Sequence, residues 1–165
     1  MTTSHELPVD SDTRRLHDRA EIGDVQLRYA TGTDSHDWAL FRSCFTDEVD
    51  VDFSDGFGQP VVRVRADDWV ASTAPRMESF AATQHMMTNL VITFDGDDRA
   101  TCVAYVRAAH HLPNDTGDSD LVVTGYYTNR FERTLDGWRI AGVKLTTLWM
   151  TGNFGVFQRA LAPTS

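Results

Sequence analysis

The stretch 121–150, LVVTGYYTNRFERTLDGWRIAGVKLTTLWM, decides the fold class of this chain. Residues 121–134 and 138–150 are rich in β-branched and aromatic side chains, which favour strands. The Leu-Asp-Gly sequence between them has the residues of a tight turn. Long strands joined by a short polar turn form an antiparallel pair.

The same pattern continues towards the N-terminus. Strands are predicted over residues 85–94 and 100–111, with the polar turn Asp-Gly-Asp-Asp at 95–98 between them. A second polar segment at 114–118 separates them from the first pair. The C-terminal half is therefore predicted to be a four-stranded antiparallel meander.

Helices are predicted to precede this meander. Apolar residues recur at helical spacing over 13–31, and Gly32 stands where that helix should stop. A second, shorter helix fits 37–45 and should pack on the first. The remaining predicted elements are short strands at 48–53 and 60–64 and a helix from Ala66 to Thr73, with room to continue towards Phe80.

This order of elements predicts an α+β fold. We expect a curved antiparallel sheet to wrap around the N-terminal helices and leave a cone-shaped cavity between the two layers. Residues 13–165 are expected to form one domain, since 165 residues suit a single core. Residues 1–12 are polar and are expected to be a disordered tail.

Composition excludes several classes of partner. The formal net charge of −9 argues against nucleic acid and anionic membranes, since both require concentrated Lys and Arg. A small neutral molecule or another protein is the expected partner. Cys44 and Cys102 lie in apolar surroundings and are expected to be buried free thiols. No secretory signal or long apolar run is present, so a cytoplasmic protein is expected.

One acid and two histidines on separate elements suggest a site for proton transfer. Asp34 follows the first predicted helix. His110 is predicted to point inward, because every second residue before it, from Cys102 to Ala108, is small and apolar. By the same alternation, His85 shares a face with Met87, Asn89 and Val91. We expect Asp34 and His110 to form a hydrogen-bonded pair, with His85 across the cavity.

Other interpretations of these residues remain open. An inward histidine is often a hydrogen-bonded core residue rather than a catalyst. Two histidines and an aspartate could also form a facial metal site, but no H-x-H or H-E-x-x-H spacing supports one, so no metal is expected. The sequence has no Gly-rich phosphate loop or G-x-S-x-G elbow. Asp50 and Asp52 are expected on a solvated strand face, and His36 and His111 at the rim or in solvent.

Four segments resemble the SnoaL-like group of the NTF2-like superfamily, which includes scytalone dehydratase and the bile-acid 7α-dehydratase. These segments are 28–38, 83–85, 106–110 and 136–142. The resemblance implies a cone-shaped α+β barrel, no cofactor, and a homodimer or homotrimer. It further implies a dehydratase (a lyase) for a small hydrophobic, polyketide- or steroid-like hydroxy-carbonyl compound. The alternatives are a cyclase or isomerase of the same fold, or a non-catalytic ligand-binding or assembly domain.

The resemblance also implies roles for individual residues. Asp34 would orient His110, and His85 and His110 would share the acid and base steps. Tyr29 matches a tyrosine of the bile-acid enzyme, and completes the expected catalytic set. Residues expected to bind the substrate are Phe53, Tyr126, Thr128 and Trp149.

The chain departs from both named relatives. Thr33 and Phe53 stand where scytalone dehydratase has two tyrosines, and His110 stands where the bile-acid enzyme has an acid. Tyr126 and Thr128 are expected to replace the lost polar groups. The outer face of the sheet is expected to carry Leu90, Ile92 and Tyr105 and to form the contact between subunits.

Overall fold

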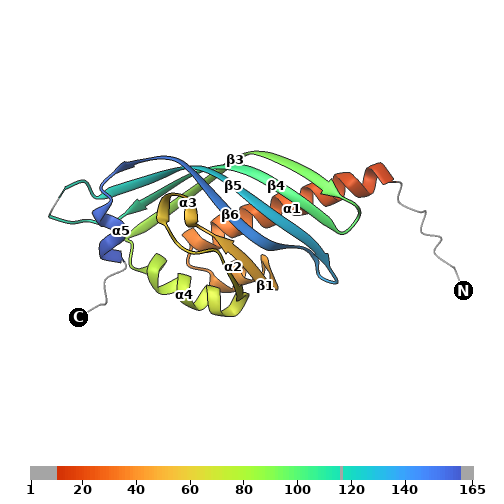
Figure 1. Ribbon diagram of the computed structural model, residues 1–165, viewed down its shortest axis with the longest axis horizontal. Coiled ribbons are helices and arrows are strands. Elements are labelled where there is room, and N and C mark those ends of the chain that lie inside the picture. Colours follow the sequence, from red (N-terminus) through yellow and green to blue (C-terminus); the bar gives the residue numbers. More distant parts are fainter. Residues whose placement is uncertain (1–10, 116, 161–165) are drawn as a thin grey trace, which may run out of the picture.

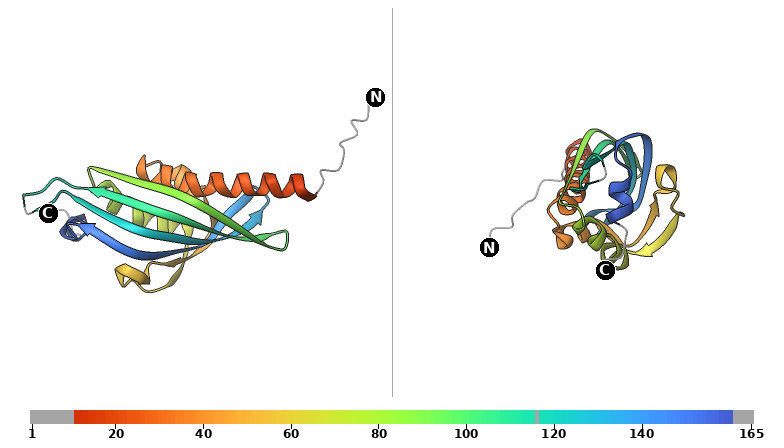
Figure 2. Two further views of the ribbon diagram at one scale, coloured as in Figure 1. Left: turned by 90° about the horizontal axis from the view of Figure 1, so that it is seen from above. Right: turned by 90° about the vertical axis from the view of Figure 1, so that its left-hand side faces the viewer.

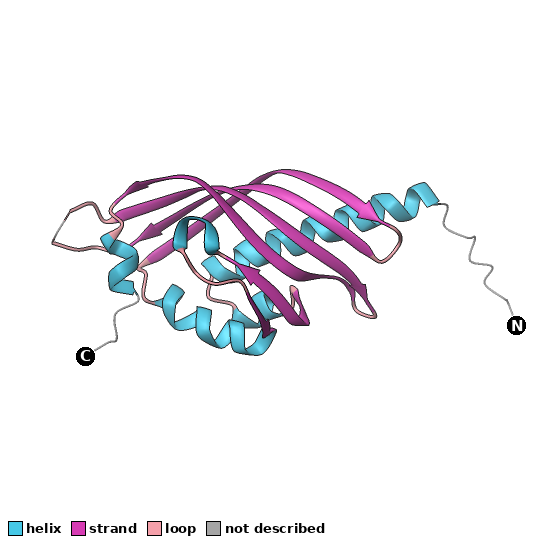
Figure 3. Cartoon of the chain, viewed as in Figure 1, coloured by secondary structure: helices cyan, strands magenta, loops and turns pink. Residues whose placement is uncertain are grey.

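A six-stranded sheet bends over a layer of helices to form an α+β cone (Figures 1 and 3). The strand order is β2-β1-β6-β5-β4-β3, so β2 and β3 are free edges and the barrel stays unclosed. The computed structural model describes residues 11–115 and 117–160. The strands are β1 (Phe45–Asp52), β2 (Val62–Arg65), β3 (Ala82–Asp95), β4 (Arg99–His111), β5 (Asp120–Thr134) and β6 (Gly137–Gly152). The helices are α1 (Ser11–Asp34), α2 (Trp38–Arg42), α3 (Ser54–Phe57), α4 (Ala66–Glu78) and α5 (Gly155–Ala160).

The predicted meander of β3 to β6 is present, and every neighbouring pair in it is antiparallel. The sheet as a whole is mixed, because β1 pairs with β6 in parallel. The expected curved antiparallel sheet is thus confirmed, with one parallel pair that the sequence did not predict. A parallel pair requires a long connection, and the chain supplies one by building β2 to β5 between β1 and β6.

Helix α1 is longer than predicted and runs along the sheet beside β3 (Figure 2). It begins at Ser11, so residues 11 and 12 belong to the helix rather than to the expected tail, and the rest of that tail lies outside the described residues. The helix also passes through Gly32 to Asp34. A Cβ on Gly32 would come within 2.7 Å of the backbone nitrogen of Phe41, so this glycine permits close packing of α2 rather than ending α1.

A bulge in β3 reverses part of the predicted alternation. Asn89 adopts a φ of 54°, and the pairing with β4 shifts between Thr88 and Val91. Beyond this point Leu90 and Ile92 pack against the core, whereas Val91 is 61% exposed. Asn89 and Val91 therefore do not share the inward face of His85, and Leu90 and Ile92 are not on the outer face. One extra residue in a strand changes the side of every residue after it.

The core lies between α1 and the concave face of β4 to β6. Ile22 and Val25 of α1 meet Phe131 and Trp138 of the sheet, all essentially inaccessible. Cys44 and Cys102 are buried free thiols, as expected. The short helices α3 and α5 were not predicted, because four to six residues are too few to show a helical period. None of the described helices has the length and apolar character needed to cross a membrane.

Candidate active site

A cavity of about 590 Å³ opens between the concave face of the sheet and helices α4 and α5. Its volume is within the range of small-molecule sites, and its walls are mainly aromatic and aliphatic. Fewer than half of its lining residues are polar. They are Tyr29, Thr33, Gln59, Asp68, Ser72, Thr73, Arg76, His85, His110, Tyr127 and Gln158.

Asp34 and His85 form a close pair at this cavity. Nδ1 of His85 lies 2.6 Å from Oδ1 of Asp34, and the His85 side chain is only 7% exposed. The predicted partner of Asp34 was His110, and that prediction was wrong. Helix α1 lies beside the edge strand β3, which carries His85, whereas His110 is on β4, one strand further away. The strand nearest the helix end supplies the partner.

Two further hydrogen bonds hold the Asp34 carboxylate. Thr83 donates its hydroxyl to Oδ1 at 2.8 Å, and the backbone N–H of His85 donates to Oδ2 at 2.6 Å. Burial by itself would raise the pKa of Asp34, but the hydrogen bonds from His85 and Thr83 outweigh it and lower that pKa below its usual value. Asp34 is therefore a fixed anion at neutral pH.

His110 lines the same cavity as His85 and lies next to it. Its ring centre is 5.5 Å from that of His85, with the planes nearly perpendicular. Phe80 and Phe157 enclose it at 5.1 and 4.6 Å, and its Nδ1 has no hydrogen-bond partner among the described residues. Burial, together with the nearby His85, lowers the pKa of His110 to about 4. His110 is therefore uncharged at neutral pH, as its inward position on β4 requires.

A pair of tyrosines adds hydroxyl groups to the same cavity. Tyr29 of α1 and Tyr127 of β5 are both buried, and their hydroxyl oxygens are 3.4 Å apart. Burial raises the pKa of Tyr127 to about 12 and raises that of Tyr29 as well, so both remain proton donors. The sequence left open whether Tyr126 or Tyr127 faces the cavity, and the structure places Tyr127 there. Alternation along β5 identifies it, because Leu121, Val123 and Phe131 at odd positions are all buried.

Three of the four predicted substrate-binding residues lie elsewhere. Phe53 lines the cavity, but Tyr126 and Thr128 are at even positions of β5 and point to the other face of the sheet. The ring of Tyr126 lies 6.5 Å from that of Tyr105 on that outer face. Trp149 is 57% exposed and pairs with Thr124, also outside the cavity. The bulge between Thr124 and Gly125 shifts the register of β6, which sequence alternation does not reveal.

The remaining histidines and the acidic cluster on α1 have other roles. His111 points outward and pairs with Asp120 at 2.6 Å, and His36 stacks on Trp38. Among the described residues, His17, Asp18 and Glu21 are close enough together to hold a metal ion. However, Asp18 accepts bonds from Arg133 and Trp138, and Glu21 accepts one from the Trp138 backbone. These carboxylates are committed to holding α1 against the sheet.

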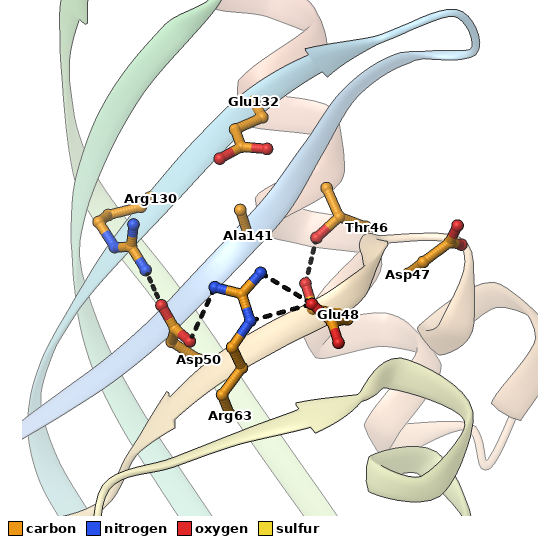
Figure 4. A pocket seen from close by; sticks show the side chains of 8 residues that line it. All are labelled: Thr46, Asp47, Glu48, Asp50, Arg63, Arg130, Glu132 and Ala141. Atoms are coloured by element: carbon orange, nitrogen blue, oxygen red, sulfur yellow. Dashed lines mark hydrogen bonds and ion pairs between the residues drawn. The ribbon is translucent and has the colours of Figure 1, made fainter.

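A second, smaller hollow of about 200 Å³ lies on the outside, and its lining is ionic (Figure 4). Arg63 on β2 bonds to Glu48 and lies within ion-pairing distance of Asp50, both on β1. Asp50 also accepts a bond from Arg130 on β5. Asp52, the other acid expected on this face, pairs with Lys144. These ion pairs link β1 to β2, to β6 and, across β6, to β5, and the apolar cavity remains the candidate active site.

Comparison with known proteins agrees with this architecture. The profile of the SnoaL-like domain family matches residues 14–144. The chain belongs to the SnoaL-like family. This SnoaL-like chain is similar to the Kfla4162 protein from Kribbella flavida, with 37% identity, a TM-score of 0.83, and coverage of 87% of this chain and 99% of that one. No curated protein matches the chain significantly.

Two more distant structures share the SnoaL-like fold alone. One is a protein of Novosphingobium aromaticivorans, provisionally assigned as a scytalone dehydratase, with 18% identity, a TM-score of 0.75, and coverage of 86% of this chain and 91% of that one. The other is a hexachlorocyclohexane dehydrochlorinase, LinA-type3, from Novosphingobium barchaimii, with 21% identity, a TM-score of 0.71, and coverage of 88% and 96%. The α+β cone has the NTF2-like fold, because a protein of the NTF2-like family from Streptomyces avermitilis shares it with a TM-score of 0.68 at 18% identity, over 81% of this chain and 98% of that one.

Proposed function

We propose that this SnoaL-like protein is a lyase that removes water from a small, largely hydrophobic hydroxy-carbonyl compound of polyketide or steroid type. The observation that carries the proposal is the half-buried Asp34–His85 pair at the wall of a mainly apolar cavity, facing an uncharged His110. An imidazole held by a fixed carboxylate is suited to accept and return a proton.

In the first half of the proposed reaction, His85 removes the proton next to the carbonyl group. Its Nδ1 is engaged by Asp34, which leaves Nε2 as the base. The electrons of the broken C–H bond form an enolate, and Asp34 stabilises the imidazolium that results. Tyr29 and Tyr127 can stabilise the enolate oxygen by hydrogen bonds from their hydroxyl groups, since both hydroxyls are buried at the cavity.

In the second half, the enolate electrons form the carbon–carbon double bond and the C–O bond to the hydroxyl group breaks. The His85 imidazolium gives its proton to the departing oxygen, which leaves as water. Proton removal and return by one ring place both events on the same face of the substrate, so the elimination is syn. His110, which is uncharged, orients the hydroxyl group by a hydrogen bond. Protons and electrons balance within substrate and His85, so we propose a reaction that needs no cofactor.

The comparisons support this proposal by analogy only. Two proteins of the same fold carry names that denote eliminations, a dehydration in one and a loss of hydrogen chloride in the other. An elimination of this kind removes a proton from one carbon and a leaving group from its neighbour. Proteins of one fold can catalyse different reactions, so the proposed function rests on the side chains of the cavity.

A direct test uses 3-hydroxy-1-tetralone, whose dehydration yields 1-naphthol, a product that absorbance detects. We expect the wild type to form 1-naphthol and His85→Ala to show no rate above background. Deuterium exchange next to the carbonyl of 1-tetralone, followed by NMR, tests proton removal separately. Exchange without loss of water would favour the isomerase or cyclase alternative. Neither exchange nor dehydration by the wild type would contradict the enzyme proposal and favour a ligand-binding domain.

We also propose that the protein forms a homodimer or homotrimer through the outer face of the sheet. Large apolar residues are exposed there, including Met86, Val91, Tyr105 and Trp149, with exposed fractions of 51–61%. Such a surface favours association with a second copy. Light scattering at micromolar concentration should give a mass of two or three chains, and Trp149→Glu should reduce it. A wild type that stays monomeric would contradict this assembly.

A further inference from the structure

Arg76 carries a cation into the cavity without a matching anion. It belongs to the last turn of α4, is half-buried, and is among the lining residues. No carboxylate in the described part of the chain lies within ion-pairing distance of it. A half-buried charge facing a mostly apolar space is costly unless something pairs with it.

Asp68, the acid of α4 that lines the cavity, is too far from Arg76 to form an ion pair with it. Asp68 is eight residues earlier, about 12 Å along the helix. Its side chain is 75% exposed and turns towards Arg65. Glu78, two residues after Arg76, accepts a bond from the Trp38 indole. The neighbouring acids are therefore distant or engaged elsewhere.

The surroundings of Arg76 resemble a polar subsite at one end of the cavity. Ser72 and Thr73 precede it by one turn on the same face of α4 and also line the cavity, as does Gln158 of α5. The two helices meet there, since the Ser79 hydroxyl donates to the Ala160 carbonyl at 3.3 Å, and Figure 1 shows them at the same end of the molecule.

This subsite lies close to the reacting groups. Phe80, four residues after Arg76, and Phe157, next to Gln158, both contact the ring of His110. A molecule that reached His85 and His110 would therefore extend naturally towards Arg76. A planar guanidinium binds a carboxylate through two parallel hydrogen bonds. A single guanidinium matches one negative charge, which favours a carboxylate over a doubly charged phosphate.

We infer that the substrate carries a carboxylate, which Arg76 binds at the α4–α5 end of the cavity while the hydroxy-carbonyl part faces His85. The inference rests on the proposed function in that it takes this cavity to be the substrate site. It narrows the substrate class to hydroxy-carbonyl acids with an apolar body. Arg76 is then a specificity-determining residue.

The test compares two ligands of nearly the same shape, 2-naphthoate and 2-naphthamide, by isothermal titration calorimetry at pH 7 and low salt. We expect the wild type to bind 2-naphthoate about 10-fold more tightly or better, the effect of one charge-assisted contact. Arg76→Gln should lose this preference and bind 2-naphthamide as before. Arg76→Lys should keep part of it, because the charge remains and the fork is lost.

Arg99→Gln is the matched control, since Arg99 is exposed at the start of β4, does not line the cavity and should leave the preference unchanged. Equal affinity of the wild type for the two ligands, including no detectable binding of either, would overturn the inference. So would a preference that survives in Arg76→Gln and Arg76→Lys alike. This experiment measures binding rather than turnover. Its result for the carboxylate subsite is therefore independent of whether the lyase proposal is confirmed.

Discussion

Helix α1 places two carboxylates against the sheet, the buried Asp18 in its first half and the half-buried Asp34 at its last residue, about 24 Å apart. Asp18 accepts a bond from Arg133 at 2.7 Å and from the Trp138 indole at 3.1 Å. Asp34 accepts bonds from His85 and Thr83 at 2.6 and 2.8 Å. In both cases burial opposes ionisation, yet the hydrogen bonds prevail and lower the pKa of the carboxyl group.

The difference between the two pairs lies in the partner and in the space beside it. Arg133 keeps its charge at every relevant pH, its guanidinium lies over the Trp138 ring at 4.5 Å, and neither Arg133 nor Asp18 lines the cavity. His85 can gain and lose a proton, and it borders a cavity. The Asp18 pair can therefore only hold structure together, whereas the Asp34 pair can transfer a proton to a bound molecule.

Exchanging each acid for its amide should separate these roles most clearly. Asp34→Asn keeps the shape but removes the charge that stabilises the His85 imidazolium, so turnover of 3-hydroxy-1-tetralone should fall by about 10³- to 10⁴-fold. Asp18→Asn should change it less than about threefold, once both proteins are shown to be folded. Steady-state kinetics measures both values. Equal losses in the two variants would remove the distinction.

The pH dependence of stability should identify His110 as a buried neutral imidazole. Its pKa is about 4 in the folded protein against 6.5 normally, so the unfolded chain binds the extra proton between these values. The free energy of unfolding should thus fall by about 3 kcal/mol as the pH falls from 6.5 to 4. The lowered pKa values of Asp18 and Asp34 add losses only below about pH 4.

His110→Phe is the variant that tests this assignment, because a phenyl ring suits the space between Phe80 and Phe157. Urea unfolding of both proteins at several pH values measures the effect. The variant should lose most of the dependence between pH 4 and 6.5. A variant that follows the wild-type curve would assign the titration to another group.

The Asp18 pair should contribute directly to the stability of the fold. Asp18→Asn weakens a charge-assisted bond to Arg133 while keeping an acceptor for the Trp138 indole, so the free energy of unfolding should fall by about 2 kcal/mol. Urea unfolding at pH 7 measures this value. Arg99→Gln, which removes an exposed ion pair with Asp95, is the control and should change stability little.

The smallest effect concerns Thr83, which positions Asp34 through one neutral hydroxyl. Thr83→Val should lower turnover about 5- to 10-fold, and Thr83→Ser should restore most of it. Because the hydroxyl helps to lower the pKa of Asp34, the acid limb of the activity profile should move to higher pH in Thr83→Val. A rate loss with an unchanged pH profile would indicate a packing defect instead.

Local patterns located most of the fold in advance. The predicted strands 85–94, 100–111, 121–134 and 138–150 each lie within a few residues of β3 to β6. Strand alternation also placed His110 inward, and it is 4% exposed. Turn residues and the alternation of side chains along a strand are local properties of the chain, so the sequence alone predicts these features.

What the sequence by itself determined is the α+β class, the order of elements and the identity of the groups available for chemistry, Asp34, His85, His110 and Tyr29. The tertiary structure alone decided which of them meet. Asp34 binds His85 because α1 lies against the edge strand, and Tyr127 rather than Tyr126 faces the cavity because the strand register sets its side. The bulge at Asn89 and the position of Arg76 in the cavity likewise depend on contacts with segments that are distant in the sequence. Pairing across the chain depends on register and layer contacts, which local periodicity does not encode.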